Sequence, residues 1–418
     1  LHEQPRDRGQ HPRVRRPNTL AVMGAPDAST WSTRIAPFEV RDIVAAARRH
    51  DEAAARSGGE PVLGLEVGQP SARPPVAVLE AARLGLEEPL GYTDALGTPE
   101  LRRAIAEFYA ERSDAMVTPE RIAVTSGASA GCVLTFITLC DPGERVVVFE
   151  PGYPCYSNIA MALGLEVETV GLGADTGYVP RPTHLDDAVA GGGAVSAVVV
   201  ASPSNPTGTA LEDEELAALH NWCRAHGATL VVDEIYHGTA TNTLPTAAAN
   251  EDTVVLQSFS KYFCMTGWRL GWLVLPPELV RPLEAVQQNL YLAPHSLSQK
   301  AALGALGATA ELDAHATGYR ANRDVLVSAL RSAGVGTIAP AHGAFYVWAD
   351  LSEWGPSPEL CKLWLEDLGV AATPGGDFDS SRGASFVRFS VAGSPTEVAE
   401  AAQRLGHWLT ERRGESPR

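Results

Sequence analysis

The chain has very little lysine. Of its 418 residues 33 are basic, yet only Lys261, Lys300 and Lys362 are lysines, and every other basic residue is an arginine. Arginine serves equally well wherever a plain positive charge is enough. It cannot replace lysine where a neutral amine is the reagent, because a guanidinium does not deprotonate in proteins. Each of the three lysines is therefore a candidate for amine chemistry.

Several features that define other protein classes are also scarce. The six cysteines form no Cys-x-x-Cys pair and the histidines show no ligand spacing, which argues against a disulfide scaffold and a metal site. No apolar run approaches the roughly 20 residues of a membrane-spanning helix. The net charge of −17 argues against nucleic-acid binding, which needs clustered basic residues. We expect a cytoplasmic protein that holds no metal and binds neither nucleic acid nor membrane.

The length predicts two to three domains. Residues 1–30 carry several arginines and no apolar periodicity, so we expect a disordered basic arm, or sequence upstream of a start at Met23. A targeting segment is the alternative interpretation. We expect residues 31–70 to belong to a smaller domain, residues 71–311 to form a large domain, and residues 312–418 to complete the smaller one.

Short apolar strands alternate with helices through the middle of the chain. A first strand is predicted at residues 62–67, and the others at residues 122–125, 145–149, 194–201, 229–233, 254–258 and 270–275. Helices are predicted at residues 98–112, 128–140 and 212–225. Nearly continuous Val, Ile and Leu is typical of strands that helices cover on both faces. The pattern predicts an α/β fold whose large domain has a mainly parallel, mixed sheet sandwiched by helices. After residue 312 the regular alternation of short apolar strands and helices ends and long helices predominate, which predicts a smaller α+β domain.

One lysine has neighbours suited to chemistry. The segment Ser258-Phe259-Ser260-Lys261 follows a predicted strand directly, and Arg269 comes shortly after it. Side chains at the carboxyl ends of parallel strands face a cleft. Two hydroxyls and a guanidinium can bind an oxyanion, and a lysine beside it can form a Schiff base. A nearby positive charge and a dry pocket favour the neutral amine. Taken alone, the segment also fits a surface loop with a solvated lysine.

Polar residues follow three other predicted strands. Asp233 ends one of them, with Tyr236 three residues later; the carboxylate suits a protonated ring nitrogen, and a helix N-cap is the alternative. Asn205 stands in a proline-stiffened turn that can present its amide as a donor, although turns favour such residues anyway. Residues 125–129 join a strand to a helix N-terminus, a favourable place for phosphate.

Taken together and in order, these segments resemble the fold-type I aminotransferases of class I/II, which use pyridoxal 5′-phosphate. The resemblance covers residues 35 to 409. Its motifs in chain order are Gly68-Gln69-Pro70, Gly91-Tyr92, Ser126–Ser129, Pro151-Gly152-Tyr153, Asn205-Pro206-Thr207-Gly208, Asp233-Glu234-Ile235-Tyr236, Ser258-Phe259-Ser260-Lys261, Gly267-Trp268-Arg269 and Arg388-Phe389-Ser390.

The resemblance implies a role for each matching residue around the cofactor. Lys261 matches the Schiff-base lysine that also moves a proton. Asp233 matches the partner of the ring nitrogen. Tyr236 and Asn205 match the donors to the phenolate oxygen, and Tyr153 matches the aromatic residue stacked on the ring. The phosphate set would comprise the backbone of Ala128 and Ser129 with Ser258, Ser260 and Arg269.

The resemblance also implies how substrate and a second subunit contribute. Tyr92 matches a residue that reaches the phosphate of the neighbouring subunit, which implies a homodimer. Arg388 matches the arginine that grips the substrate carboxylate, assisted by Asn205 and the Gly68 backbone. Residues 342–346 match the entry into the small domain and are expected to border the substrate side chain.

The resemblance implies an aminotransferase that moves an amino group from an L-amino acid to a 2-oxo acid in two half-reactions. Ile35, Pro37 and Phe38 suit an apolar pocket for neutral or aromatic side chains. One alternative is a β-lyase or a biosynthetic elimination or cyclisation enzyme of the same fold. A transcription regulator with such a domain is a second alternative, but some thirty N-terminal residues are too few for a winged helix.

Overall fold

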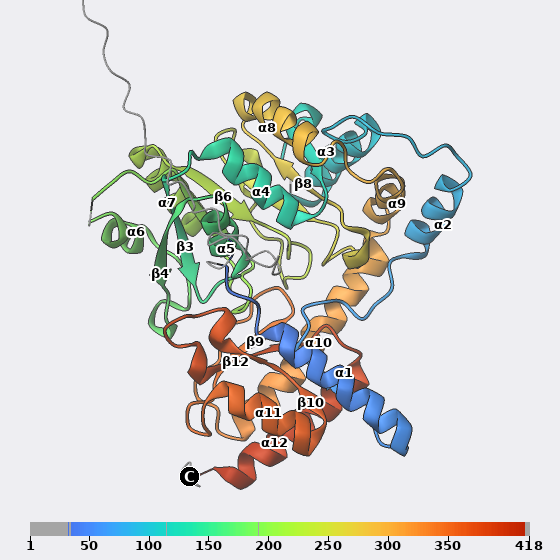
Figure 1. Cartoon of the computed structure of the whole chain (residues 1–418), viewed down its shortest axis with the longest axis vertical. Coiled ribbons are helices and arrows are strands. Elements are labelled where there is room, and N and C mark those ends of the chain that lie inside the picture. The colour runs from blue at the N-terminus through green and yellow to red at the C-terminus, as the bar shows by residue number, and fades with distance from the viewer. Residues whose placement is uncertain (1–31, 33–34, 114, 191, 414–418) are drawn as a thin grey trace, which may run out of the picture.

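The computed structural model describes residues 32, 35–113, 115–190 and 192–413. The predicted basic arm, residues 1–30, lies outside this part of the chain. A seven-stranded sheet of order β2-β8-β7-β6-β5-β3-β4 forms the centre of the larger body, and a smaller body packs below it in Figure 1.

The large sheet is mixed and mainly parallel. Its strands are β2 (Ile122–Thr125), β3 (Arg145–Glu150), β4 (Glu166–Gly171), β5 (Ala197–Ala201), β6 (Thr229–Asp233), β7 (Val254–Ser258) and β8 (Gly271–Val274). The ladders from β4 through β3, β5 and β6 to β7 are parallel, whereas β8 runs antiparallel to both of its neighbours. The predicted α/β fold is confirmed.

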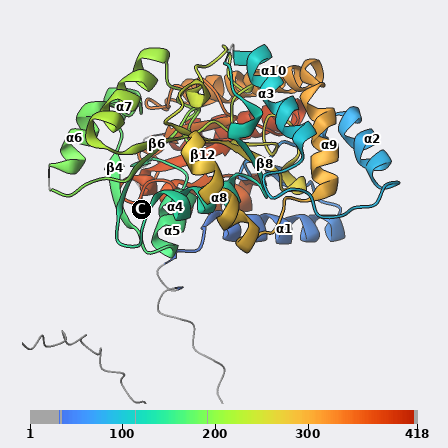
Figure 2. The same cartoon turned by 90° about the horizontal axis from the view of Figure 1, so that it is seen from above.

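Helices bury both faces of this sheet. One face carries α4 (Ala128–Leu139), α5 (Cys155–Ala162) and α8 (Pro277–Leu290); the other carries α2 (Val76–Gly85), α3 (Pro99–Ser113), α6 (Pro182–Val189), α7 (Asp213–His226) and α9 (Ser296–Leu306). Figure 2 shows α4, α5 and α8 on one side of the strands and α3 on the other. Successive residues of β5 alternate between the two apolar clusters, with Val198 in one and Val199 in the other. Because side chains alternate across a strand, burial on both faces requires a continuous apolar run.

The smaller body contains two short sheets. Its elements are α1 (Val40–Ser57), β1 (Leu63–Gly64), β9 (Tyr346–Asp350), α11 (Ser357–Leu368), β10 (Val370–Ala371), β11 (Thr373–Pro374), β12 (Phe386–Ser390) and α12 (Pro395–Arg412). Strand β12 lies between β11 and β9 in an antiparallel sheet, and β1 pairs in parallel with β10. The Asp377 carboxylate accepts the backbone N–H groups of Glu39 and Val40, which attaches the start of α1 to this body.

Helix α10 (Thr309–Ser332) belongs to both bodies. Leu312 in its first turn packs into the core under the large sheet, whereas Leu326 and Leu330 pack into the core of the smaller body. Figure 1 shows α10 running from one body into the other. The domain boundary that we predicted at residue 312 therefore falls inside a continuous helix, and the division into domains stays a prediction.

Some elements differ from the sequence-based predictions. The strand predicted at residues 62–67 contains only Leu63–Gly64, because only these two residues pair with β10. Short 3₁₀ helices at Pro119–Arg121, Ala174–Thr176, Ala247–Ala249, Thr266–Trp268, Gly375–Asp377 and Gly383–Ser385 connect the main elements. All six cysteines are free thiols. In the described part of the chain, no helix combines the length and apolarity needed to cross a bilayer.

Candidate active site

A cavity of about 270 Å³ opens at the carboxyl ends of β5, β6 and β7. The segment 67–69, next to β1, closes it from the smaller body. All but two of the predicted site residues line this cavity: Gly68, Ala128, Ser129, Tyr153, Asn205, Asp233, Tyr236, Ser258, Ser260, Lys261 and Arg269. The exceptions are Arg388, which is buried beside Asn205, and Tyr92, which is 86% exposed on the surface.

Lys261 projects from the loop after β7 towards the smaller body. Its Nζ donates a hydrogen bond of 2.6 Å to the backbone oxygen of Gly68. Burial, together with the positive charges of Arg388 and Arg269, lowers the pKa of the amine to about 8, and Asp233 opposes them. A substantial fraction of this amine is therefore neutral near physiological pH, as a nucleophile or proton acceptor requires.

The depressed pKa of Lys261 predicts a stability cost in protein without cofactor. Since the pKa falls from its usual value near 10.5 to about 8, folding is penalised as pH drops through this interval and fully penalised below it. We expect cofactor-free Lys261→Met to be more stable than wild type at pH 7, by up to about 3 kcal/mol, with the difference shrinking towards pH 10. Urea unfolding at both pH values measures this.

Lys300→Met is the matched control, because Lys300 pairs on the surface with Glu88 and should show no such gain. A Lys261→Met variant that is no more stable than wild type at pH 7 would contradict the burial of the Lys261 amine.

Asp233 ends β6 on the floor of the cavity. Its carboxylate accepts the Tyr156 hydroxyl at 2.5 Å and the Ile235 backbone N–H at 3.1 Å. Burial nevertheless raises the pKa of Asp233 to about 6. A buried carboxylate of this kind favours a positively charged partner, such as a protonated ring nitrogen. We did not predict Tyr156 as a partner of Asp233 from the sequence. Its position three residues after Tyr153, a predicted site residue, is the feature that could have identified it.

An anion cradle lies at the start of α4. No side chain caps this helix, whose N-terminal N–H groups and dipole favour a negative charge. The Arg269 guanidinium donates to the Thr266 backbone oxygen at 3.1 Å and reaches Ser260 Oγ at 3.5 Å. Gly127 has φ +89°, and a Cβ there would lie 2.5 Å from Arg269 Nη2. Glycine at this position therefore lets the guanidinium lie against the helix start, and the cradle fits a phosphate dianion.

Arg388 of β12 is held in a rigid setting. Its guanidinium carbon lies 4.6 Å from the ring centre of Tyr346 and 4.5 Å from that of Phe378. Nη1 donates to Asn205 Oδ1 at 3.1 Å and Nη2 to the Glu66 backbone oxygen at 2.7 Å. Its Nε is buried and has no hydrogen-bond partner among the described residues. Such an unsatisfied N–H on an arginine fits a carboxylate ligand.

A second cavity, of about 280 Å³, adjoins the first and shares Tyr153 and Tyr156 with it. Pro37, Phe38 and Phe378 give it apolar walls. Its charged lining residues are all acidic: Glu39, Glu150 and Asp377. Pro37 and Phe38 thus lie beside the site, whereas Ile35 is 39% exposed and does not line this cavity.

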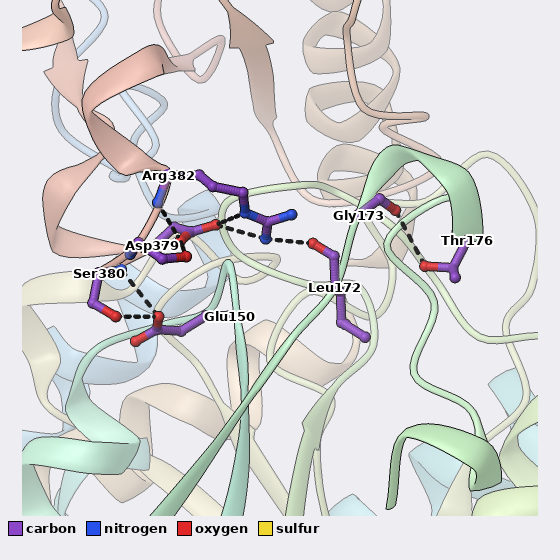
Figure 3. Close-up of polar contacts among 8 residues, drawn as sticks. Glu150, Leu172, Gly173, Thr176, Asp379, Ser380 and Arg382 are labelled. Carbon is purple, nitrogen blue, oxygen red and sulfur yellow. Dashed lines mark hydrogen bonds and ion pairs between the residues drawn. The ribbon is translucent and has the colours of Figure 1, made fainter. Parts of the chain in front are cut away.

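Polar contacts join the smaller body to the sheet beside the second cavity, which Glu150 and Ser380 line (Figure 3). Ser380 donates its backbone N–H and hydroxyl to Glu150 Oε2 at 2.9 and 2.7 Å. Arg382 Nη2 donates to the Leu172 backbone oxygen at 2.6 Å and to Asp379 at 2.7 Å. These bonds join the 379–382 turn to the ends of β3 and β4, so the smaller body is held against the edge of the sheet.

The described residues contain no group of three or more His, Cys, Asp or Glu side chains placed to hold a metal ion. His237, next to Tyr236, faces away from the site and lines a different cavity. Burial lowers the pKa of His237 to about 4, so its imidazole is neutral at physiological pH.

Comparisons with known proteins agree with this arrangement. The family "Aminotransferase class I and II" matches residues 60–405. A valine–pyruvate aminotransferase of Mycobacterium tuberculosis is 44% identical over 387 residues, which cover 90% of this chain and 97% of the relative. An aspartate/prephenate aminotransferase of Thermus thermophilus is 34% identical, over 85% of this chain and 92% of the relative.

Solved structures show the same relationship. The crystal structure of an aminotransferase from Mycobacterium tuberculosis superimposes with a TM-score of 0.87 at 42% identity, covering 93% of this chain and all of that one. The aspartate aminotransferase of Thermus thermophilus with maleate gives a TM-score of 0.83 at 31% identity, covering 91% and 99%. With the family matched over most of its length, this chain is an enzyme that belongs to the class I and II aminotransferases.

Proposed function

We propose that this enzyme is a pyridoxal-phosphate-dependent aminotransferase that moves the amino group of a neutral L-amino acid to a 2-oxo acid in two half-reactions. The observation that carries the proposal is one cavity that combines a partly neutral amine at Lys261, a buried carboxylate at Asp233 and the anion cradle beneath Arg269. These three features match the reactive carbon, ring nitrogen and phosphate of one cofactor.

Each feature has a definite task in this proposal. The cradle binds the phosphate, and Asp233 stabilises the protonated ring nitrogen. Asn205 accepts from Arg388 through Oδ1, which leaves its Nδ2 available to donate to the phenolate oxygen beside Tyr236. Tyr153 covers the ring. When bound, pyridoxal phosphate supplies the electron sink for breaking a bond at the substrate Cα.

Arg388 and Lys261 act on the amino acid itself. Arg388 holds the α-carboxylate, and its aromatic neighbours restrict the guanidinium to one orientation. In the proposed reaction the amine of Lys261 would take the proton from the substrate Cα and deliver it to the C4′ carbon of the cofactor. Holding the carboxylate in one place orients the Cα–H bond for this transfer, a kind of positioning that contributes several kcal/mol.

The second cavity supports a neutral, apolar side chain. Its walls include Phe38 and Phe378, and the charged side chains that a second carboxylate on the substrate would meet there are all acidic. The relative named valine–pyruvate aminotransferase, at 44% identity, agrees with an aliphatic donor. We therefore propose valine-like amino acids as donors and pyruvate as an acceptor.

A panel of donors tests the proposed function. Enzyme loaded with pyridoxal phosphate is incubated with valine, leucine, phenylalanine or aspartate, first without and then with pyruvate. We expect valine to change the cofactor spectrum without pyruvate, and alanine to form once pyruvate is added, with parallel double-reciprocal plots. Ammonia release without any need for pyruvate would instead support a β-lyase, and a preference for aspartate would overturn the proposed side-chain class.

The surface around Tyr92 supports a homodimer. Exposed apolar side chains occur on α2, on the loop that follows it, and at and just after the end of α8: Val76, Leu79, Leu86, Leu90, Leu290 and Leu292. Exposed apolar patches of this kind mark interaction sites. We propose that a second copy of the chain covers them, so that Tyr92 reaches the partner's phosphate cradle.

Subunit complementation tests this shared site. Tyr92→Ala and Lys261→Ala are each expected to be nearly inactive, but a mixed dimer contains one site with both residues intact. After unfolding and refolding the two variants together, we expect about a quarter of wild-type activity, because half of the dimers are mixed and each has one intact site. Activity no higher than the mean of the two separate variants would show that Tyr92 does not act across an interface.

A further inference from the structure

We propose that Tyr346 is a positioning residue that directs the single proton of Tyr236 towards the cofactor and connects this tyrosine to Arg388. The inference rests on the proposed function, in which Tyr236 donates to the phenolate oxygen of pyridoxal phosphate.

Tyr346 contacts three parts of the site. It begins β9 and is 2% exposed, with its hydroxyl oxygen 2.8 Å from that of Tyr236. Its ring lies 4.6 Å from the guanidinium carbon of Arg388. A Cβ at Gly68 would lie 1.9 Å from the Tyr346 oxygen, so the tyrosine needs glycine at the residue whose backbone oxygen accepts Lys261 Nζ. One side chain of the smaller body thus contacts groups proposed to bind both cofactor and substrate.

Counting protons gives the direction of the bond between the two tyrosines. Burial raises the pKa of both Tyr236 and Tyr346, so each hydroxyl carries one proton at physiological pH. A hydroxyl has one proton to donate and can also accept. If Tyr236 donates to the cofactor, it cannot donate to Tyr346 as well, and Tyr346 must donate to Tyr236.

The surroundings of Tyr346 favour this direction. The positive charge of Arg388 opposes the effect of burial on the pKa of both tyrosines. The hydrogen bond between their hydroxyls lowers the pKa of Tyr346 and raises that of Tyr236, which makes Tyr346 the better donor of the two. A hydroxyl that accepts one hydrogen bond donates the next one more strongly, because the two bonds polarise each other. Tyr346 therefore strengthens the hydrogen bond from Tyr236 to the phenolate.

A pH titration of the bound cofactor's absorbance in Tyr346→Phe tests the hydroxyl alone. Without the hydrogen bond from Tyr346, the Tyr236 hydroxyl donates more weakly to the phenolate oxygen, so the phenolate is less stabilised and the cofactor holds its proton more tightly. We expect the titration midpoint to rise by about half a pH unit, and that of Tyr236→Phe to rise further in the same direction. In the double variant the contribution of Tyr346 should vanish, since its effect passes through the Tyr236 hydroxyl.

Binding of 3-methylbutanoate, a carboxylate without an amino group, tests the contact with Arg388. Tyr346→Phe keeps the ring and should change its Kd less than twofold, whereas Tyr346→Leu should weaken binding about 3- to 30-fold. Tyr319→Phe is the matched control: its hydroxyl is also buried in the smaller body but contacts Cys264, so both readouts should stay at wild-type values.

An unchanged midpoint in Tyr346→Phe, or equal effects of that substitution with and without the Tyr236 hydroxyl, would overturn the inference. Wild-type protein that does not bind pyridoxal phosphate would overturn the proposed function instead, so the two failures are distinguishable.

Discussion

Lys261→Arg is expected to abolish turnover in a protein that still folds. The substitution keeps a positive charge in the cavity but removes the amine that can become neutral. Since Lys261 is proposed both to bond the cofactor and to move the Cα proton, kcat should fall by about 10⁴-fold or more. In the family that the chain resembles, an absorbance band at roughly 420 nm reports the bond between lysine and cofactor, and this band should be lost as well.

Lys300→Arg is the control for this experiment. It makes the same chemical change at a lysine paired with Glu88 on the surface, where arginine serves equally well. We expect wild-type kcat and spectrum. Retention of the absorbance band and of activity by Lys261→Arg would show that the amine of Lys261 is not the reagent.

Asp233→Asn is expected to lower kcat/KM by about 10²- to 10³-fold. The amide has nearly the same shape but no charge to stabilise a protonated ring nitrogen. Steady-state kinetics with saturating pyridoxal phosphate measures the loss.

Stability measurements separate this loss from misfolding. Burial raises the pKa of Asp233 to about 6, so the ionised carboxylate destabilises the cofactor-free fold above that pH. This cost disappears as the pH falls from about 6 towards the usual pKa of an aspartate. We expect Asp233→Asn without cofactor to be at least as stable as wild type at pH 7.

Tyr156→Phe provides a graded comparison, because it removes one hydrogen bond to Asp233 and leaves the charge. We expect about a tenfold loss of kcat/KM, between wild type and Asp233→Asn. If Tyr156→Phe were as damaging as Asp233→Asn, the charge of Asp233 would not be the feature that matters.

The central strands were predictable because their signal is local. The predicted bounds of β2, β6 and β7 equal the observed ones, since each is a run of apolar residues that ends at polar or turn residues. The edge strand β4 and the short helix α5 were not predicted. Among the strands that the structure describes, β4 pairs only with β3; it mixes Glu and Thr with valine, so it lacks the continuous apolar run. Helix α5 has eight residues, too few for a clear period.

The sequence by itself determined the mixed α/β fold, the family and the side chains that the candidate site offers. The reason is that chemistry depends on residue type, and parallel strands bring residues such as Asp233 and Lys261 to the same edge.

Only the tertiary structure decided how those side chains are tuned. The bonds of Tyr156 with Asp233, of Tyr346 with Tyr236 and of Arg388 with Asn205 join residues 77, 110 and 183 positions apart. The lowered pKa of Lys261 and the raised pKa of Asp233 follow from burial. This burial and these long-range contacts arise when the two bodies pack around the cavity. A local sequence pattern therefore does not predict them.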